Sequence, residues 1–260
     1  DRSVSRGLGD VYKRQEREIV REQLGGTAVP EIGEVTDYIR VLDRSGYFET
    51  VTLSEDDLKR NDMYRANAQR AKAQSRFADY HDYLLSLEMT AEIGDFSPLY
   101  LQRITQLTNK SNQFNLTTKR YTAEQMEAVY NSDEYIRLYG KLYDKFGDNG
   151  VVAVTIGKTD SEDKGRLDIE LWLMSCRVLK RDMELAMLDS LVEQAKKRGI
   201  REIYGHYYPT AKNKMVAGLY ESFGFEKISQ DEDGNTAWRL LVEGYEDKNT
   251  VIKVKEEHYA

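Results

Sequence analysis

The sequence predicts an α/β domain, a central mixed β-sheet flanked by helices, over residues 96–260. Helical and strand patterns alternate along this stretch, which is typical of mixed sheets. Apolar residues make up 40% of the 260-residue chain, which also contains 18 glycines. Counted together, these residues make up a fraction of the chain that is ordinary for globular proteins. The chain is therefore long and apolar enough to build a substantial core.

The composition also excludes several kinds of function. A formal charge of −7 argues against non-specific nucleic-acid binding. The single cysteine, Cys176, cannot form an internal disulfide, and no apolar run approaches the roughly 18 residues that cross a membrane. We expect a soluble cytoplasmic protein with no nucleic-acid or membrane partner, and the three histidines form no pattern of metal ligands.

Residues 1–15 resemble neither a helix nor a signal peptide. The stretch Asp10-Val11-Tyr12-Lys13-Arg14-Gln15 can be read from GAT GTG TAT AAG AGA CAG, which resembles the transposase mosaic end of sequencing libraries. The stretch Ser5-Arg6-Gly7-Leu8-Gly9 matches the primer tail before it. We expect residues 1–15 to be an adapter-derived artefact joined to a gene fragment, with a genuine basic leader as the alternative.

Residues 16–95 read as short helical elements that precede the domain. Ser54 and Asp57 form a capping-box start for a long charged helix, and Gly46 closes the helix before it. Pro98 excludes a continuing helix, which favours a boundary at residues 95–96. The expected helices cover Glu16–Leu24, Val35–Arg44 and Ser54–Gln74, with an extended segment at Thr27–Pro30.

The elements of the domain follow from caps, turns and periodicity. Thr122 caps a first helix, the stretch 147–150 supplies a turn, and Gly199 stops a long amphipathic helix. In the stretch 167–174 the even-numbered and odd-numbered side chains are expected on opposite faces. The expected strands are Tyr135–Phe146, Val151–Ile156, Leu167–Ser175, Ile200–His206, Phe225–Ile228, Ala237–Val242 and Val251–Val254, and the helices are Thr122–Tyr130, Asp182–Arg198 and Lys212–Phe223.

Two strand-to-helix junctions carry the chemistry. In the first, which runs from Cys176 to Ala186, three basic residues precede a helix N-terminus, an arrangement that can hold a phosphate. In the second, Asn213 and Tyr220 stand two helical turns apart and hence on nearly the same face of one helix, and Gly224-Phe225 then ends the helix and begins a strand.

Together these junctions resemble the two CoA-handling motifs of the GNAT acyltransferases. The first is similar to the family's pyrophosphate loop as Arg181-x-x-Glu184-x-Ala186, with Glu184 in place of the usual glycine. The resemblance implies that Tyr220 protonates a departing thiolate and that Glu170 is a general base. It also implies a CoA or phosphopantetheine site formed by Arg177, Lys180, Arg181, Ala186 and Asn213.

A narrower resemblance extends over almost everything after Gln15. The stretches 107–118, 146–150 and 172–177, with Pro209-Thr210-x-Lys212-Asn213-x-Met215-Val216, are similar to FkbH-like, HAD-IIIC proteins. The family joins a HAD phosphatase to a GNAT-like domain and loads a glyceryl-type acyl group onto an acyl carrier protein. The resemblance implies that residues 16–95 contain the C-terminal remnant of a HAD domain, whose nucleophile loop and acidic pair for magnesium are not found in this sequence.

Several candidate residues have two readings. Cys176 is either a transient acyl acceptor or a buried structural cysteine, and Tyr220 is either an acid or a packed ring. His206 reads as a satisfied strand residue. An amide-rich stretch either binds a pantetheine arm or a hydroxylated acyl group, or satisfies buried backbone; it contains Asn109, Asn112, Gln113 and Asn115.

Three functions remain open at this point. The first is an acyl-loading enzyme that acts on a small acyl substrate and an acyl carrier protein. The second is a non-catalytic domain that docks the carrier protein for the HAD site, and the third is a CoA-dependent N-acetyltransferase. Because carrier proteins are usually acidic, a local basic group favours the carrier as partner; it consists of Arg177, Lys180, Arg181, Lys212 and Lys214.

Overall fold

The computed structural model describes residues 16–23, 28–31, 33–46 and 60–256, and the chain divides into two compact units, Asp1–Arg60 and Asn61–Ala260. In the first unit, residues 16–23 are helical, η1 covers Val35–Asp37 and α2 covers Tyr38–Arg44. The predicted adapter-derived segment and the predicted helix start at Ser54 lie outside the described residues.

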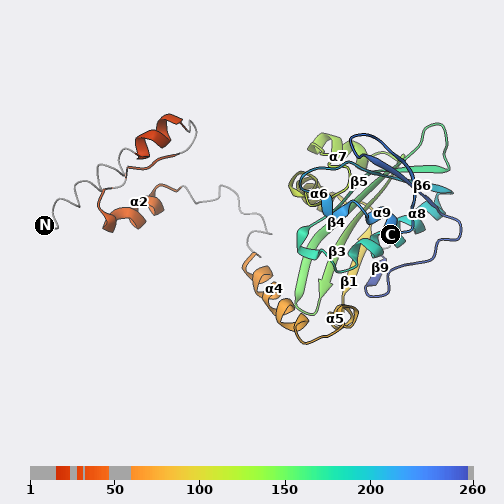
Figure 1. Cartoon of the computed structure of the whole chain (residues 1–260), viewed down its shortest axis with the longest axis horizontal. Helices are drawn as coiled ribbons and strands as arrows, with labels where there is room; N and C mark the ends of the chain where they lie inside the picture. Colours follow the sequence, from red (N-terminus) through yellow and green to blue (C-terminus); the bar gives the residue numbers. More distant parts are fainter. Residues whose placement is uncertain (1–15, 24–27, 32, 47–59, 257–260) are drawn as a thin grey trace. The chain divides into compact units, whose positions relative to one another are not determined.

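The second unit contains a mixed sheet (Figure 1). Its strand order is β7-β8-β6-β5-β4-β3-β1-β9, and a short β2 pairs with β5. The pairs β5–β6 and β1–β9 are parallel, whereas the other pairs are antiparallel. The strands are β1 (Thr90–Gly94), β2 (Phe114–Asn115), β3 (Tyr135–Asp144), β4 (Gly147–Thr159), β5 (Arg166–Met174), β6 (Glu202–Tyr207), β7 (Glu226–Gln230), β8 (Thr236–Leu241) and β9 (Lys253–Glu256).

Helices and two buried clusters flank this sheet. The larger cluster includes Leu84, Leu191 and Tyr220, whereas the smaller one includes Ile104 and Met126. The α/β class with a mixed sheet and flanking helices is therefore confirmed. The helical elements are α4 (Arg60–Gln74), α5 (Tyr80–Ser86), α6 (Pro98–Lys110), α7 (Ala123–Tyr130), η2 (Cys176–Val178), α8 (Met183–Lys197), η3 (Lys214–Val216) and α9 (Leu219–Ser222).

Local signals place several of these elements. The Thr122 side chain accepts a hydrogen bond from the Gln125 amide and forms a capping box that starts α7. Pro98 stands in the first turn of α6. Gly199 follows α8 with φ of 71°, a left-handed conformation that glycine adopts without strain.

Some predicted boundaries differ from the structure. The turn between β3 and β4 lies at residues 145–146, because the expected turn residues 147–150 already belong to β4. The strand β1 was not predicted, and it pairs with β3. The predicted boundary at residue 96 consequently falls inside the sheet-bearing unit, which begins at Asn61.

The predicted helix over 212–223 is broken into two short pieces. Between η3 and α9, Gly218 has φ of −96° and ψ of 10°, which is not helical. The expectation that Asn213 and Tyr220 share one helix face is therefore wrong, because Asn213 precedes η3 and Tyr220 belongs to α9.

A β-bulge at Glu170 changes the faces of β5. Ile156 on β4 pairs with Leu171, but the next residue, Gly157, pairs with Ile169, so Glu170 is the extra residue. As a result, Leu167 and Ile169 join the same buried cluster as Trp172 and Met174, while Leu171 and Leu173 join the other. The predicted simple alternation along β5 is wrong because the bulge reverses it.

Candidate functional site

The parallel strands β5 and β6 diverge toward their carboxyl ends. They pair only from Arg166 with Glu202 to Asp168 with Tyr204, although β5 continues to Met174 and β6 to Tyr207. In sheets with parallel strands, ligands bind in the crevice outside the carboxyl ends of the strands. The divergence of β5 from β6 is therefore the kind of place where such sheets bind ligands.

The chain's own segment 114–117 fills this crevice. β2 pairs with β5 at Met174 and Leu173, and the Leu116 amide then donates to the Trp172 carbonyl at 3.1 Å. On the other side, the Tyr208 amide donates to the Leu116 carbonyl at 2.9 Å. An extended ligand that paired with both strands would have to displace this segment.

The predicted amide site residues, except Gln113, hydrogen-bond to the chain itself. Asn213 is fully buried, and its Nδ2 donates to the carbonyls of Asn115 and Tyr208, each at 2.9 Å. Asn115 Oδ1 accepts from the Thr118 amide at 2.9 Å. Asn109 Nδ2 donates to the Tyr121 carbonyl at 3.0 Å. Of the two remaining residues, Asn112 accepts from Arg120 and Gln113 is exposed.

Tyr220 is buried within the core. Its ring contacts Trp172, Phe225 and Trp238, with centroid distances of 6.4, 5.0 and 6.4 Å. A Cβ atom at Gly205 would lie 2.3 Å from this ring, so the glycine is needed for the close approach. Burial also raises the pKa of the Tyr220 hydroxyl. The arrangement fits the packed-ring reading rather than an acid that meets substrate.

The N-terminus of α8 is crowded and covered. Lys180 and Asp182 have φ of 62° and 59°, so the loop before the helix is tightly turned. The Tyr80 hydroxyl donates to the Lys180 carbonyl at 2.6 Å. Burial raises the pKa of Glu184 to about 7, and its Oε2 is buried without a hydrogen-bond partner. Ala186 is fully buried.

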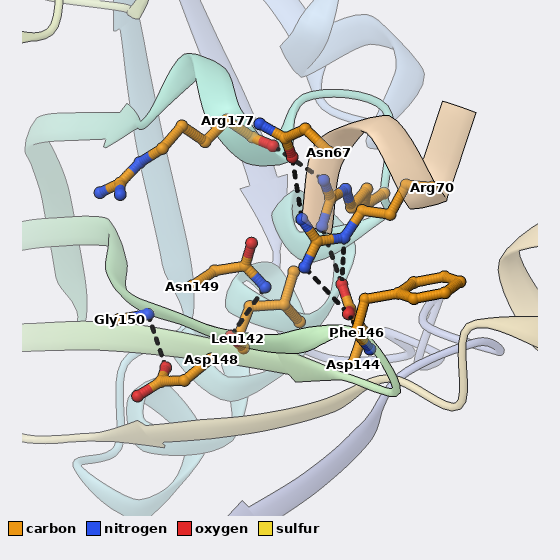
Figure 2. A network of polar contacts seen from close by, with 10 residues as sticks. Asn67, Arg70, Leu142, Asp144, Phe146, Asp148, Asn149, Gly150 and Arg177 are labelled. Atoms are coloured by element: carbon orange, nitrogen blue, oxygen red, sulfur yellow. Dashed lines mark hydrogen bonds and ion pairs between the residues drawn. The ribbon is translucent and has the colours of Figure 1, made fainter. Parts of the chain in front are cut away.

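Two arginines share one buried carboxylate at the end of β3. Figure 2 shows Asn67 and Arg70 of α4 beside Asp144, whose side chain is 0% exposed. Arg70 Nε and Nη2 lie 2.7 and 2.9 Å from the two carboxylate oxygens, and Arg181 Nη1 lies 3.1 Å from Oδ2. Burial and the nearby Arg70 lower the pKa of Arg181. Two guanidinium groups against one carboxylate leave one positive charge uncompensated within this cluster.

A cavity of about 660 Å³ opens beside this cluster, between α4, α5 and η2. Its lining contains four cationic side chains and no carboxylate, and it includes the Cys176 thiol. Cys176 is exposed, so the buried structural reading is wrong. Lys212 and Lys214 are also exposed but do not line this space. We call it the cation cavity, and its cations are Arg70, Arg177, Lys180 and Arg181.

A second polar hollow lies where β5 and β6 begin to separate. Glu170 accepts hydrogen bonds from Lys119 and from the Tyr121 hydroxyl there, the latter at 3.2 Å. His206 Nε2 lies 3.2 Å from Asp168 Oδ1. The sequence reading missed the His206–Asp168 contact, because the two residues stand 38 positions apart on different strands.

Two features are absent from the part of the chain that the structure describes. It contains no group of three or more His, Cys, Asp or Glu side chains that could hold a metal ion. Nor does it contain a helix with the length and apolar character needed to cross a membrane.

Comparisons with known proteins found similarity to solved structures only. No family model and no curated protein matches the sequence. The structure is similar to the ribosomal-protein-S18-alanine N-acetyltransferase of Escherichia coli, at 14% identity and a TM-score of 0.45, over 62% of this chain and 99% of that chain. The yncA protein of Salmonella typhimurium, solved with its cofactor acetyl-CoA, is similar at 14% identity and a TM-score of 0.45, over 61% and 96%. A GNAT-family acetyltransferase of Streptococcus pneumoniae is similar at 16% identity and a TM-score of 0.44, over 58% and 99%.

Proposed function

We propose that residues 61–260 bind a small acyl group carried as a thioester, and that the carrier is an acyl carrier protein. The observation behind this proposal is the cation cavity, which has four cations, no lining carboxylate and an exposed thiol. Arginine and lysine side chains recognise phosphate through charge-assisted hydrogen bonds. We place the phosphate of a phosphopantetheine arm in this cavity, against Arg177 and Lys180.

Within this proposal the domain docks the carrier rather than acting as a CoA-dependent N-acetyltransferase. The segment 114–117 occupies the crevice that an extended CoA arm would need. Tyr220 is too deeply buried to reach a thiolate, and Glu184 crowds the amides at the start of α8. Each of these features weakens binding or turnover of free CoA, but none of them closes the cation cavity.

The resemblance to FkbH-like proteins supports the same partner. On this proposal the chain is the carrier-handling part of a longer acyl-loading protein, in which a HAD domain with magnesium supplies a glyceryl-type acyl group. The docked arm would then present its thiol to that domain. Acidic carriers also match the positive charge around the cavity.

A catalytic variant of this proposal is favoured by the Cys176 thiol, which is exposed and lines the same cavity. In that variant the Cys176 sulfur attacks the acyl carbon of an incoming thioester, the C–S bond of that thioester breaks, and the released thiolate keeps the electron pair. The substitution Cys176→Ser distinguishes the docking proposal from the catalytic one. It should abolish acyl loading if Cys176 is catalytic, and it should leave carrier binding intact in either case.

The test is the affinity of the full chain for a carrier protein that bears phosphopantetheine. We expect Lys180→Glu to weaken binding about tenfold at low salt, because it removes one attractive charge and adds a repulsive one. The matched control is Lys164→Glu, an exposed lysine in the loop before β5. Equal affinity of both variants and the unmodified chain would contradict the proposed cavity, and so would equal binding of a carrier that lacks the arm.

A further inference from the structure

The second polar hollow is separate from the cation cavity. Its volume is about 390 Å³, and it shares no lining residue with that cavity. Three stretches of chain meet in it: β5, the end of β6 and the loop after β2. The polar lining side chains are Thr117, Lys119, Asp168, Glu170, His206 and Tyr208.

Asp168 is held as a carboxylate by two partners. Burial raises its pKa, but hydrogen bonds from His206 and Arg166 outweigh burial and the net pKa is lowered. Arg166 Nε and Nη2 contact the two carboxylate oxygens at 2.8 and 2.6 Å. The Arg166 guanidinium also lies over the Tyr204 ring, 4.0 Å from its centroid. Asp168 is therefore ionised and fixed in place.

This carboxylate sets the tautomer of His206. An ionised carboxylate only accepts hydrogen bonds, so Nε2 of His206 must carry the hydrogen in the 3.2 Å contact. In the neutral ring the other nitrogen, Nδ1, is then the proton acceptor. Among the described residues, nothing forms a hydrogen bond with Nδ1.

The imidazole ring is also fixed against its neighbours without being sealed off. It stacks on Tyr208 with an interplanar angle of 15°, and its side chain is 28% exposed. A histidine oriented by a carboxylate, with its outer nitrogen free beside a hollow, is the arrangement that general-base catalysis requires.

We propose that His206 and Asp168 form a general-base pair for a small alcohol or amine bound in this hollow. His206 Nδ1 takes the proton of the bound O–H or N–H group as its oxygen or nitrogen bonds to the acyl carbon of a thioester. The C–S bond breaks, and the departing thiolate takes the proton from Nδ1, so His206 ends neutral. His206 is the catalytic residue and Asp168 is the positioning residue. The acyl-thioester donor rests on the proposed function, whereas the dyad itself does not.

The surrounding charges favour a polar acceptor. Glu170 and Lys119 form an ion pair at the wall of the hollow, so a ligand there meets a carboxylate and an ammonium group together. Hydroxyl and amino groups can hydrogen-bond to both the carboxylate and the ammonium group. An apolar acceptor would displace water from these two groups without replacing its hydrogen bonds.

The charged or titratable groups around His206 are Asp168, Arg166 and Glu170 on β5, Lys119 in the loop, and Tyr204 and Tyr208. The pKa of Asp168 is lowered by its hydrogen bonds despite burial, hydrogen bonding to Asp168 raises that of Arg166, and burial raises that of Tyr204. These three shifts lead away from neutrality, so none of these three groups exchanges a proton near neutral pH.

The experiment uses the full chain with S-phenyl thioacetate as donor and ethanolamine as acceptor, and acetylated ethanolamine is measured by mass spectrometry. We expect product above the protein-free rate, at least a hundredfold less protein-dependent rate in His206→Gln, and no change in the control His81→Gln on α5. Asp168→Asn should lower kcat, and Asp168→Glu should restore part of that loss.

Unchanged rates in His206→Gln and a second variant, His206→Asn, would overturn the dyad, and so would the absence of protein-dependent product. Melting temperatures of the variants confirm that they fold. Neither result depends on carrier binding, so a chain that binds the carrier but lacks this reaction would refute the dyad alone. Conversely, a chain that acetylates ethanolamine but ignores the carrier would refute the proposed function alone.

Discussion

Asp144 and Asp168 both pair with arginine, but their surroundings differ. The Asp144 side chain is 0% exposed and lies between Arg70 and Arg181. The Asp168 side chain is 24% exposed and lies between Arg166 and His206, whose outer nitrogen stays free. Both carboxylates fix their neighbours, but only the second fixes a neighbour that can still exchange a proton.

With the proposed dyad, this difference separates a structural role for Asp144 from a chemical role for Asp168. A buried ion cluster with every oxygen engaged holds α4 and the loop before α8 against the end of β3. A half-buried pair beside a hollow contributes less to stability and leaves a group available to a ligand. Substitutions at the two aspartates should therefore affect different measurements.

The largest effect on stability is expected for Asp144→Asn. The substitution leaves two buried guanidinium groups without their carboxylate, and breaking a buried ion pair in this way costs about 3–5 kcal/mol. Denaturant unfolding measures the loss. The control is Asp233→Asn in the exposed turn before β8, which should stay within about 0.5 kcal/mol. A loss of less than about 1 kcal/mol in the free energy of unfolding for Asp144→Asn would show that water reaches the cluster.

Glu184→Gln should stabilise the protein at alkaline pH. Burial raises the pKa of Glu184 from 4.5 to about 7, so the folded state binds this proton more tightly than the unfolded state. Stability contributed by this group is present below pH 4.5 and is lost as pH rises to about 7, by about 3 kcal/mol at most.

The glutamine variant removes that loss. We expect equal stability of the two proteins near pH 4 and a more stable variant at pH 8, as measured by unfolding across this range. A difference that does not depend on pH would contradict the buried, protonated carboxyl.

Asp168→Asn should have a smaller effect on stability than Asp144→Asn. Because its partners Arg166 and His206 are partly solvated, the expected loss is about 1 kcal/mol or less. The same unfolding assay measures it. If Asp168→Asn destabilised the protein as much as Asp144→Asn, Asp168 would be a structural residue and the contrast between the two sites would fail.

Tyr220→Phe tests the packed-ring role and should have the smallest effect on stability. The ring contacts remain and only a buried hydroxyl is lost, so stability should change by about 1 kcal/mol or less. The rate of ethanolamine acetylation should not change. A tenfold loss of that rate, with stability preserved, would instead support the acid role that the sequence motif implies.

Local sequence signals predicted much of the fold. The Thr122 cap and the glycine after α8 depend on neighbouring residues, and the structure confirms both. The bulge at Glu170 and the pairing of β2 with β5 depend on contacts between distant segments, which local periodicity does not encode.

The site was harder to predict than the fold for the same reason. The motif identified Arg177, Lys180 and Arg181 as a basic group, and all three line the cation cavity. It did not reveal that Arg70 from α4 joins them, or that Asp144 engages Arg181. His206 stood in a predicted strand with no local partner, and only the parallel pairing of β5 with β6 brings Asp168 to it.

In the proposed function, the filled crevice is what excludes free CoA, and amide hydrogen exchange at Leu116 and Tyr208 tests it most directly. Because these two amides bond across the crevice, we predict protection comparable to that of β5, unchanged by millimolar CoA. Rapid exchange in the free protein, or loss of protection when CoA is added, would contradict the account, because the segment 114–117 would then be a displaceable loop and the crevice a CoA site.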